Sequence, residues 1–140
     1  MYKAKIRVRM MASDAHYAGE LVNGAHMLSI FGDLATELAI CSDGDEGLFR
    51  TYEHVDFLAP VYAGDFIEAV GWYSSYGVTS RTMEFEAWKV IGLTRADKAH
   101  SAADILQKPV LVGRATGIIV IPKNCQRKGF MSLEDMIKPD

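Results

Sequence analysis

The sequence predicts an α+β fold in which a curved, mostly antiparallel sheet of about five strands wraps around one long central helix. One strand-like segment precedes the only long helical segment, and strand-like segments joined by short connections follow it. A doubly wound fold needs strands and helices that alternate, so this order excludes it. With 140 residues, the chain is expected to form a single domain, with its core at residues 4–122 and a polar tail at residues 123–140.

The first strand is expected at residues 3–10, where charged and apolar side chains alternate strictly. A period of two indicates a half-buried strand. Its wet face carries four cations: Lys3, Lys5, Arg7 and Arg9. A solvated strand face is the simpler interpretation of these cations, and contact with an anionic ligand or a partner subunit is the alternative.

The helix is expected from Gly24 to about residue 41, with Asn23 suited to cap its start. Apolar residues recur along it at spacings of four and three, which is the pattern of a helix that packs on a sheet: Met27, Phe31, Leu34, Leu38 and Cys41. Another face carries His26, Ser29, Asp33 and Glu37. The simplest interpretation of His26 is a residue of the helix surface or of an interface.

Further strands are expected at residues 48–57, 65–76, 80–91 and 110–121. A connection punctuated by proline and glycine joins the first two at residues 58–64. Residues 92–108 form a polar insertion in which residues 101–106 could make a helical turn. The tail contains a weakly amphipathic segment at residues 132–137 and is expected to be loosely attached.

Composition and charge exclude several classes of function. A net charge of −3 gives no bulk attraction to nucleic acid or to an anionic membrane. No apolar run approaches the roughly 18 residues of a membrane span, and no secretory signal is expected. Cys41 and Cys125 show no motif spacing, which predicts a reduced, cytoplasmic protein. The histidines are scattered, so no metal site is expected.

Residues 14–24 are the most informative stretch for function, because this polar loop leads directly into the helix. A helix N-terminus presents unpaired backbone N–H groups and a positive dipole end, which stabilise a phosphate or an enolate oxygen. The loop also carries three titratable side chains: Asp14, His16 and Glu20. We therefore expect chemistry at the start of the helix.

Several motifs together resemble those of a known family. They are the glycine-bearing loop before the helix, the segment at residues 57–65, and stretches at residues 13–17, 24–28, 32–37, 43–50 and 79–86. Over residues 4–122 the chain resembles the hot dog superfamily of acyl-CoA thioesterases, dehydratases and hydratases. Within that superfamily it looks most like the small 3-aminobutyryl-CoA and β-alanyl-CoA ammonia-lyases of amino-acid (lysine) fermentation.

This resemblance implies a lyase that eliminates ammonia from a 3-aminoacyl-CoA, with 3-aminobutyryl-CoA to crotonyl-CoA as the favoured reaction. It also implies no metal or redox cofactor, and a homo-oligomer in which two sheets join in a dimer, commonly within a tetramer or hexamer, with the site shared between subunits. An acyl-CoA thioesterase and a non-catalytic acyl-CoA-binding module are the alternatives. His16 precedes Gly19 by three residues, where thioesterases of this superfamily tend to carry Asp or Asn. The hydratase pair, an Asp and a His five residues apart, is missing.

Ammonia elimination needs a base for the α-proton, and a partly desolvated carboxylate is suitable. Glu20 and Asp33 rank first as the base, Asp14 would orient it, and Glu37 shares the helix face of Asp33. The alternatives are turn formation or capping for the loop acids and a solvated face for the helical acids. His16 could orient a carboxylate or bind the leaving amine, and a hydrogen bond to backbone is its structural alternative.

The thioester oxygen is expected at the backbone N–H groups near Asn23 and Gly24, with Tyr17 beside them. Packing at a dimer interface is the alternative role for Tyr17. The phosphates of CoA should attract cations, because guanidinium and ammonium groups bind phosphate well. The candidates are Arg81, Arg114, Lys123, Arg127 and Lys128. For the last three, a solvated patch is an equal alternative.

Overall fold

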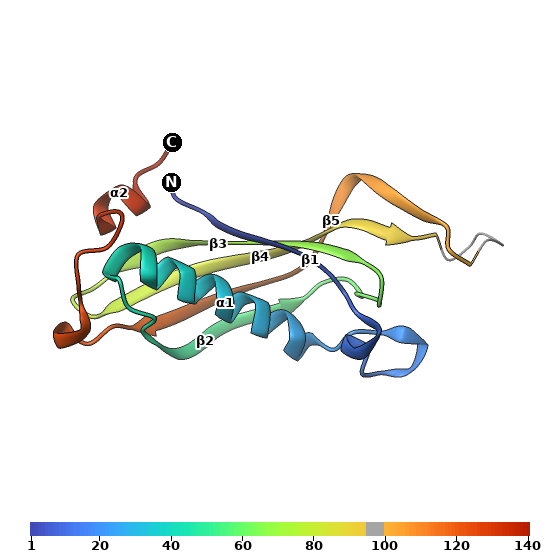
Figure 1. The fold of residues 1–140 in the computed structure, drawn as a ribbon, viewed down its shortest axis with the longest axis horizontal. Coiled ribbons are helices and arrows are strands. Elements are labelled where there is room, and N and C mark those ends of the chain that lie inside the picture. The colour runs from blue at the N-terminus through green and yellow to red at the C-terminus, as the bar shows by residue number, and fades with distance from the viewer. Residues whose placement is uncertain (95–99) are drawn as a thin grey trace.

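The computed structural model of the chain describes residues 1–94 and 100–140. In this part, five antiparallel strands form one sheet in the order β1-β3-β4-β5-β2, and α1 (Gly24–Asp43) lies across one face of it (Figure 1). The strands are β1 (Ala4–Arg9), β2 (Leu48–Phe57), β3 (Phe66–Tyr76), β4 (Ser80–Leu93) and β5 (Ala103–Val120). This is the predicted α+β arrangement. No helix among these residues is long and apolar enough to cross a membrane.

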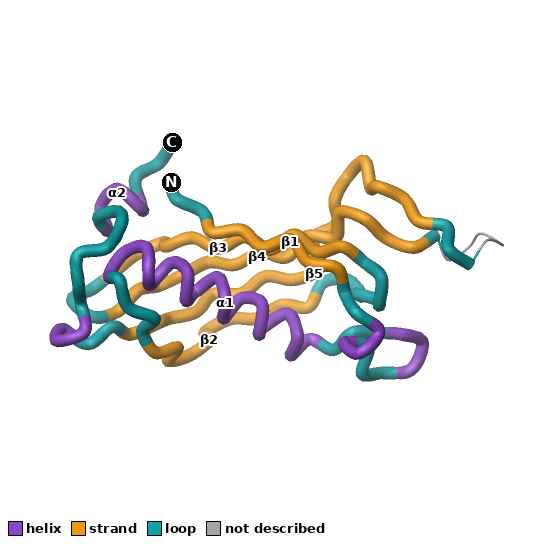
Figure 2. The backbone as a smooth tube through the Cα atoms, viewed as in Figure 1, coloured by secondary structure: helices purple, strands orange, loops and turns teal. Residues whose placement is uncertain are grey.

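The core lies between α1 and the sheet (Figure 2). In the first half of β4 every second residue is buried: Arg81, Met83, Phe85 and Ala87. Phe85 lies opposite Gly71 of β3 and Ala115 of β5, so its ring stacks on Phe31 of α1 with 5.0 Å between centroids. A Cβ at Gly71 would be 2.9 Å from Phe85 Cδ1. The close approach of this ring to β3 therefore requires glycine.

Both ends of α1 are capped. Asn23 Oδ1 accepts a hydrogen bond from the His26 N–H at 3.1 Å, which satisfies one donor of the first turn. At the other end Gly44 takes the left-handed conformation, with φ of 60°, and stops the helix. The helix continues past its predicted end at residue 41 to Asp43, whose side chain pairs with Arg81 inside the protein.

The connection between β4 and β5 differs from the prediction. The expected helical turn at residues 101–106 is wrong, because β5 begins at Ala103, which pairs with Leu93 at the end of β4. The two strands continue as a hairpin that projects beyond the rest of the sheet (Figures 1 and 2). An exposed hairpin is held by backbone hydrogen bonds and buries neither face, so its sequence need not show alternating apolar residues. Residues 95–99 of the predicted insertion lie outside the described residues.

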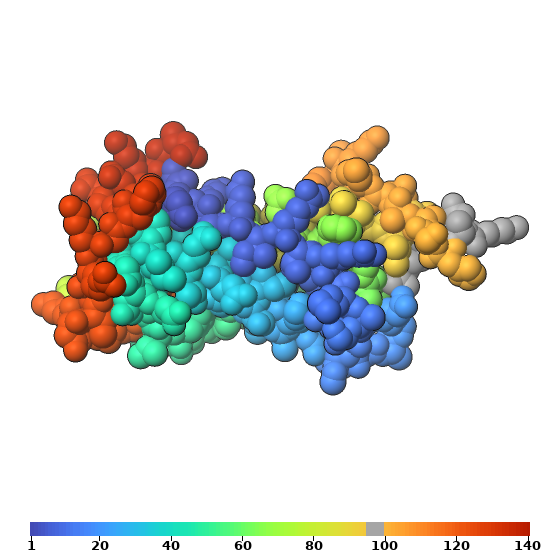
Figure 3. Space-filling model, viewed as in Figure 1, coloured from blue at the N-terminus to red at the C-terminus, as the bar shows by residue number. Residues whose placement is uncertain are grey.

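The C-terminal tail is packed on the core, so the prediction of loose attachment is wrong. The short helix α2 (Leu133–Ile137) is capped by the Ser132 hydroxyl, and its Met136 is fully buried. The Phe130 N–H donates a hydrogen bond to the Cys41 carbonyl oxygen at 2.8 Å, near the end of α1. Figure 3 shows this tail beside α1 and the N-terminal segment. Met131, Leu133 and Ile137 are partly buried and also pack against the core.

Candidate active site

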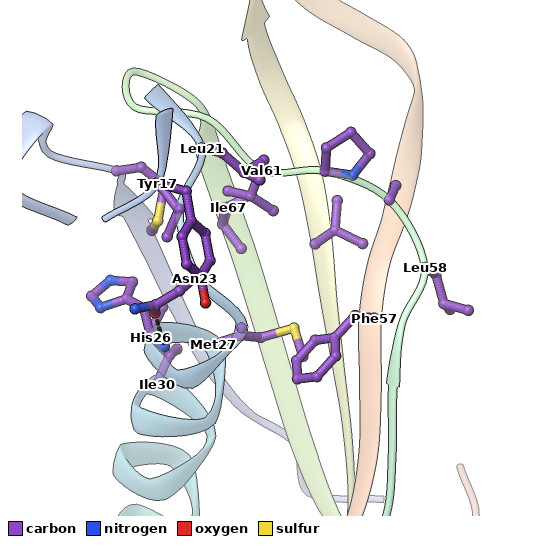
Figure 4. A pocket seen from close by; sticks show the side chains of 16 residues that line it. Tyr17, Leu21, Asn23, His26, Met27, Ile30, Phe57, Leu58, Val61 and Ile67 are labelled. Atoms are coloured by element: carbon purple, nitrogen blue, oxygen red, sulfur yellow. Dashed lines mark hydrogen bonds between the residues drawn. The ribbon is translucent and has the colours of Figure 1, made fainter. Parts of the chain in front are cut away.

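A cavity of about 470 Å³ lies at the N-terminal end of α1. Its walls come from the loop before α1, the first turns of α1, the end of β2 with the connection after it, and adjoining parts of β3 and β5. Most of its lining is apolar, including Met27, Ile30, Phe57, Ile67 and Val112. Its polar lining includes Tyr17, Asn23 and His26 (Figure 4). An apolar cavity with a few polar groups at one end is typical of a small-molecule site.

The start of α1 forms part of the cavity wall. Asn23 and Gly24 both line the cavity, and the ring of Tyr17 extends from the preceding loop toward them (Figure 4). The first turn of an α-helix leaves N–H groups without intrahelical acceptors, so this end can stabilise a negatively charged oxygen. The structure thus brings these three predicted residues together, and their roles in binding stay predictions.

Phe57 closes one side of the cavity against the helix start. A Cβ at Gly24 would be 2.5 Å from Phe57 Cζ, a distance at which the ring would have to move. Glycine at position 24 therefore lets the aromatic ring approach the helix backbone, and this contact shapes the cavity beside the free N–H groups.

An ion pair holds the connection between β2 and β3 against the sheet. Lys89 Nζ lies 2.9 Å from Asp65 Oδ2 and donates a hydrogen bond to the Pro60 carbonyl oxygen at 2.9 Å. The same carboxylate oxygen accepts the Tyr62 N–H at 2.8 Å. The loop before α1 joins this arrangement, because the Ala63 N–H donates to the Glu20 carbonyl oxygen at 2.9 Å. Lys89 and Asp65 therefore position two walls of the cavity.

Asp14 lies beside His26 at the edge of the cavity. Its Oδ2 accepts a hydrogen bond from the Met11 N–H at 2.8 Å and is 3.6 Å from His26 Nε2. The carboxylate is thus held by its own loop and can orient the imidazole. His16 is exposed and makes an edge contact with the Tyr17 ring, with centroids 5.6 Å apart. Asp14 therefore contacts a residue of the cavity lining.

The other candidate carboxylates have exposed side chains. No Asp or Glu is among the described residues that line it. Glu20 stands on an exposed turn with φ of 66°. Asp33 and Glu37 are on the exposed side of α1, where Glu37 Oε2 accepts the Tyr2 hydroxyl at 3.4 Å. In a single subunit these positions suit the structural alternatives, and a catalytic role for any of them stays a prediction.

The predicted contact of Arg81 with a CoA phosphate is wrong for this structure. Its side chain is buried beside Asp43, so the guanidinium cannot meet a ligand at the mouth of a pocket. Arg114 projects from β5 on the sheet face away from α1 and its Nε lies 2.9 Å from Asp56 Oδ2. Together with His54, this guanidinium holds the pKa of Asp56 below its usual range.

The cluster of Lys123, Arg127 and Lys128 lies at the C-terminal end of α1. The Arg127 N–H donates a hydrogen bond to the Asp43 carbonyl oxygen at 2.9 Å, and its Nη1 donates to that of Gly44 at 3.4 Å. α1 contains 20 residues, which corresponds to about 30 Å. Figure 1 shows the segment after β5 beside the C-terminal end of α1. The cavity lies at the N-terminal end of α1, so the cluster is not at the cavity of its own subunit.

Comparison with known proteins identifies the family. Residues 19–96 match the model of the thioesterase superfamily. The chain belongs to this superfamily. It is 56% identical over 126 residues to a 3-aminobutyryl-CoA ammonia lyase of Acetoanaerobium sticklandii, a match that covers 90% of this chain and 99% of that protein.

Solved structures of this superfamily agree with the fold. The β-alanyl-CoA:ammonia lyase from Clostridium propionicum matches with a TM-score of 0.91 and 42% identity, covering 96% of each chain. A hexameric hot dog fold thioesterase of Campylobacter jejuni matches with a TM-score of 0.69 and 17% identity, covering 90% of this chain and 88% of that one. The second likeness shows the fold alone. The predicted hot dog fold is confirmed.

Two features of this hot dog protein's cavity lie beyond what the sequence predicts. His26, interpreted as a surface or interface residue, lines the cavity and contacts Asp14. Met27, interpreted as a core residue, forms part of the cavity wall. Both follow the cap residue Asn23 by three or four positions and so lie on its side of the helix. With the helix start taken as the site, this spacing could have identified His26 and Met27 as cavity residues from the sequence.

Proposed function

We propose that this protein is an acyl-CoA lyase that eliminates ammonia from 3-aminobutyryl-CoA, or from a close 3-aminoacyl-CoA, to give the enoyl-CoA. The observation that carries the proposal is the 56% identity to a 3-aminobutyryl-CoA ammonia lyase along 90% of the chain. The match to a β-alanyl-CoA:ammonia lyase at 42% identity supports the same reaction class. An apolar cavity next to a helix start suits a short acyl chain with a polarised thioester oxygen.

The reaction is an elimination across C2 and C3 of the acyl chain. A base removes the proton from C2, and the negative charge that develops on the thioester oxygen is stabilised by the N–H groups near Gly24. The electron pair of the C2–H bond forms the double bond, and the C3–N bond breaks so that the substrate ammonium departs as ammonia. The removed proton converts this ammonia to ammonium in solution. No step calls on a redox or metal cofactor.

His26 is the proton acceptor in this proposal, and Asp14 is its positioning residue. An imidazole nitrogen can accept a proton, and a carboxylate 3.6 Å from Nε2 stabilises the imidazolium that results. Glu20 and Asp33 are the competing bases, as carboxylates that would act on the cavity of a neighbouring subunit. Tyr17 offers a hydroxyl to the departing nitrogen or to the thioester oxygen.

The proposal includes a homo-oligomer built from dimers. Hot dog proteins of similar fold are described as hexameric. In one subunit the cluster of Lys123, Arg127 and Lys128 is about 30 Å from the cavity, so a second subunit is needed for these cations to meet the phosphates of a CoA bound there. Arg114 is a further candidate for such a contact.

One assay tests the function. The protein is mixed with crotonyl-CoA and ammonium, and the enoyl absorbance and free thiol are followed together. Loss of the enoyl absorbance without thiol release is the expected result, because the lyase runs in reverse. Thiol release would instead identify an acyl-CoA thioesterase. Binding of crotonyl-CoA without either signal would identify a non-catalytic acyl-CoA-binding module.

Four matched variants test the base. His26→Gln should lower kcat by about 10²-fold to 10⁴-fold, the usual worth of a general base, and Asp14→Asn should lower it less, with a shifted pH profile. Glu20→Gln and Asp33→Asn should leave kcat near that of the wild type. If the last two variants abolish turnover while His26→Gln does not, a carboxylate is the base and the assignment to His26 is wrong.

A further inference from the structure

Met27 occupies the space where a side chain at position 113 would lie. A Cβ built at Gly113 would come closer than 3.0 Å to both Sδ and Cε of Met27, whereas the next nearest atom, the Asp56 carbonyl oxygen, would be at 3.2 Å. Figure 4 shows the Met27 side chain extending from α1 toward Phe57. The position of this side chain in the cavity wall therefore depends on the absence of a side chain at position 113.

The position of Met27 along α1 matches the length of a short acyl chain. Met27 follows Asn23 by four residues, so it lies on the same side of the helix, about 6 Å further along the axis. If the thioester oxygen is bound at the helix start, C3 and its substituent extend along the helix axis toward Met27. Met27 is 8% exposed, and Ile67 and Val112 complete the apolar lining nearby.

We propose that Met27, held against Gly113, is the specificity-determining residue for the substituent on C3 of the substrate. The inference rests on the proposed function, and it goes further by assigning the acyl-chain preference to one contact. The flexible thioether packs against a methyl substituent, as in 3-aminobutyryl-CoA. β-Alanyl-CoA has no substituent on C3 and cannot make this contact. The propyl substituent of 3-aminohexanoyl-CoA is longer and clashes with the sulfur and terminal methyl group of Met27.

The test compares kcat/KM for these three thioesters in variants of the pair. One methylene in an apolar pocket changes discrimination by about 10-fold to 200-fold. Met27→Ala enlarges the cavity and should raise the ratio of 3-aminohexanoyl-CoA to 3-aminobutyryl-CoA by at least about 10-fold. Gly113→Ala displaces Met27 into the cavity and should shift preference toward β-alanyl-CoA. The double variant Met27→Ala/Gly113→Ala has no thioether to displace, so it should show the preference of Met27→Ala alone.

Gly117→Ala is the matched control. It adds the same methyl group to the same strand, where the Cβ would be 2.7 Å from Phe49 Cζ, and Gly117 is outside the cavity lining. It should lower stability without changing the ratio of the three substrates. The proposal is overturned if Met27→Ala and the double variant both keep ratios within about twofold of the wild type, well below the effect of one methylene. These two variants decide the question even if Gly113→Ala alone does not fold.

Failure of the proposed function would be distinguishable from failure of this inference. If the wild-type protein releases thiol instead of ammonia, the same variants are compared on the hydrolysis of propionyl-CoA, butyryl-CoA and hexanoyl-CoA. A shift of chain preference in that series would support the role of Met27 and reject the lyase. Lyase activity with an unchanged chain preference in the variants would support the proposed function and reject the role of Met27.

Discussion

Arg81 and Asp43 form a bidentate ion pair inside the protein. Nη2 lies 3.0 Å from Oδ1 and Nε lies 3.2 Å from Oδ2, and the two residues are 1% and 5% exposed. The remaining Nη1 donates hydrogen bonds to the carbonyl oxygens of Gly77 and Ser80, at 3.0 Å and 2.9 Å. One guanidinium thus joins the last residue of α1 to the turn between β3 and β4.

Replacing Arg81 with methionine should destabilise the protein by about 3–5 kcal/mol, because Asp43 would be left as a buried charge without a partner. Urea denaturation measures this change. Asp43→Asn in the same variant should restore part of the loss, and Lys123→Met is the control for removal of an exposed cation. A higher KM for the CoA thioester with unchanged stability would contradict the structural role. It would instead support the predicted contact of Arg81 with a CoA phosphate.

Much of this fold could be predicted from periodicity. The strand expected at residues 80–91 corresponds to β4, and the spacing of Met27, Phe31 and Leu34 predicts α1. Burial of Arg81 was hidden, because a charged residue at an inward position is expected inside only when its partner is known, and Asp43 is 38 residues away in the chain. Residues 103–109 of β5 were missed because exposed strand residues carry no apolar pattern.

The sequence predicted chemistry at the start of α1, and the structure has a cavity there. The loop before α1 and the start of the helix do line the cavity, since a polar loop at a helix N-terminus is a local feature of the sequence. The contact of Asp14 with His26 depends on how the loop folds back on the helix, and no spacing encodes it. The sequence ranked Glu20 and Asp33 first as the base, and the structure leaves both side chains exposed.

Lys89→Met should weaken substrate binding as well as stability. Asp65 is 2% exposed, so loss of its partner leaves a buried charge and costs about 3 kcal/mol. The wall formed by the connection after β2 would also lose the hydrogen bond to Pro60, and KM for the CoA thioester should rise. Kinetics and urea denaturation measure the two effects. Lys5→Met, on the exposed face of β1, should change neither, and an unchanged KM in Lys89→Met would argue against a role in shaping the cavity.

A mixed oligomer tests whether the cations at the end of α1 serve a neighbouring cavity. Lys123→Gln/Arg127→Gln/Lys128→Gln should raise KM for the CoA thioester by about tenfold or more, with kcat unchanged, because charge-assisted contacts to phosphate would be lost. The His26→Gln variant should lower kcat instead. Co-expressed with separate tags, the two chains should form hybrids in which one site keeps both His26 and the cations.

The activity of the purified hybrids below KM should exceed the sum of the two parent proteins. Equal mixtures of separately folded parents are the control for chains that do not exchange. Activity no greater than that sum would mean that cations and cavity do not meet across subunits, and the cluster would then be a solvated patch.

Removing Arg114 should raise the pKa of Asp56. In the native protein the Arg114 guanidinium is the main cause of the lowered pKa, with His54 as the second. NMR titration of the Asp56 carboxyl carbon in Arg114→Gln should therefore give a value closer to the ordinary value of 3.8. His54→Gln should produce a smaller change in the same direction.

The interaction of Arg114 with Asp56 predicts how stability depends on pH. A carboxyl whose pKa is lower in the folded state binds fewer protons folded than unfolded, so its contribution to stability is present above the unfolded pKa and disappears as the pH falls through the folded pKa. The stability difference between the wild type and Arg114→Gln should accordingly be constant from pH 6 to 8, about two units or more above the ordinary carboxyl pKa, and shrink in acid. A difference that stayed constant down to the acid limit would assign the effect of Arg114 to packing of its side chain and not to its charge.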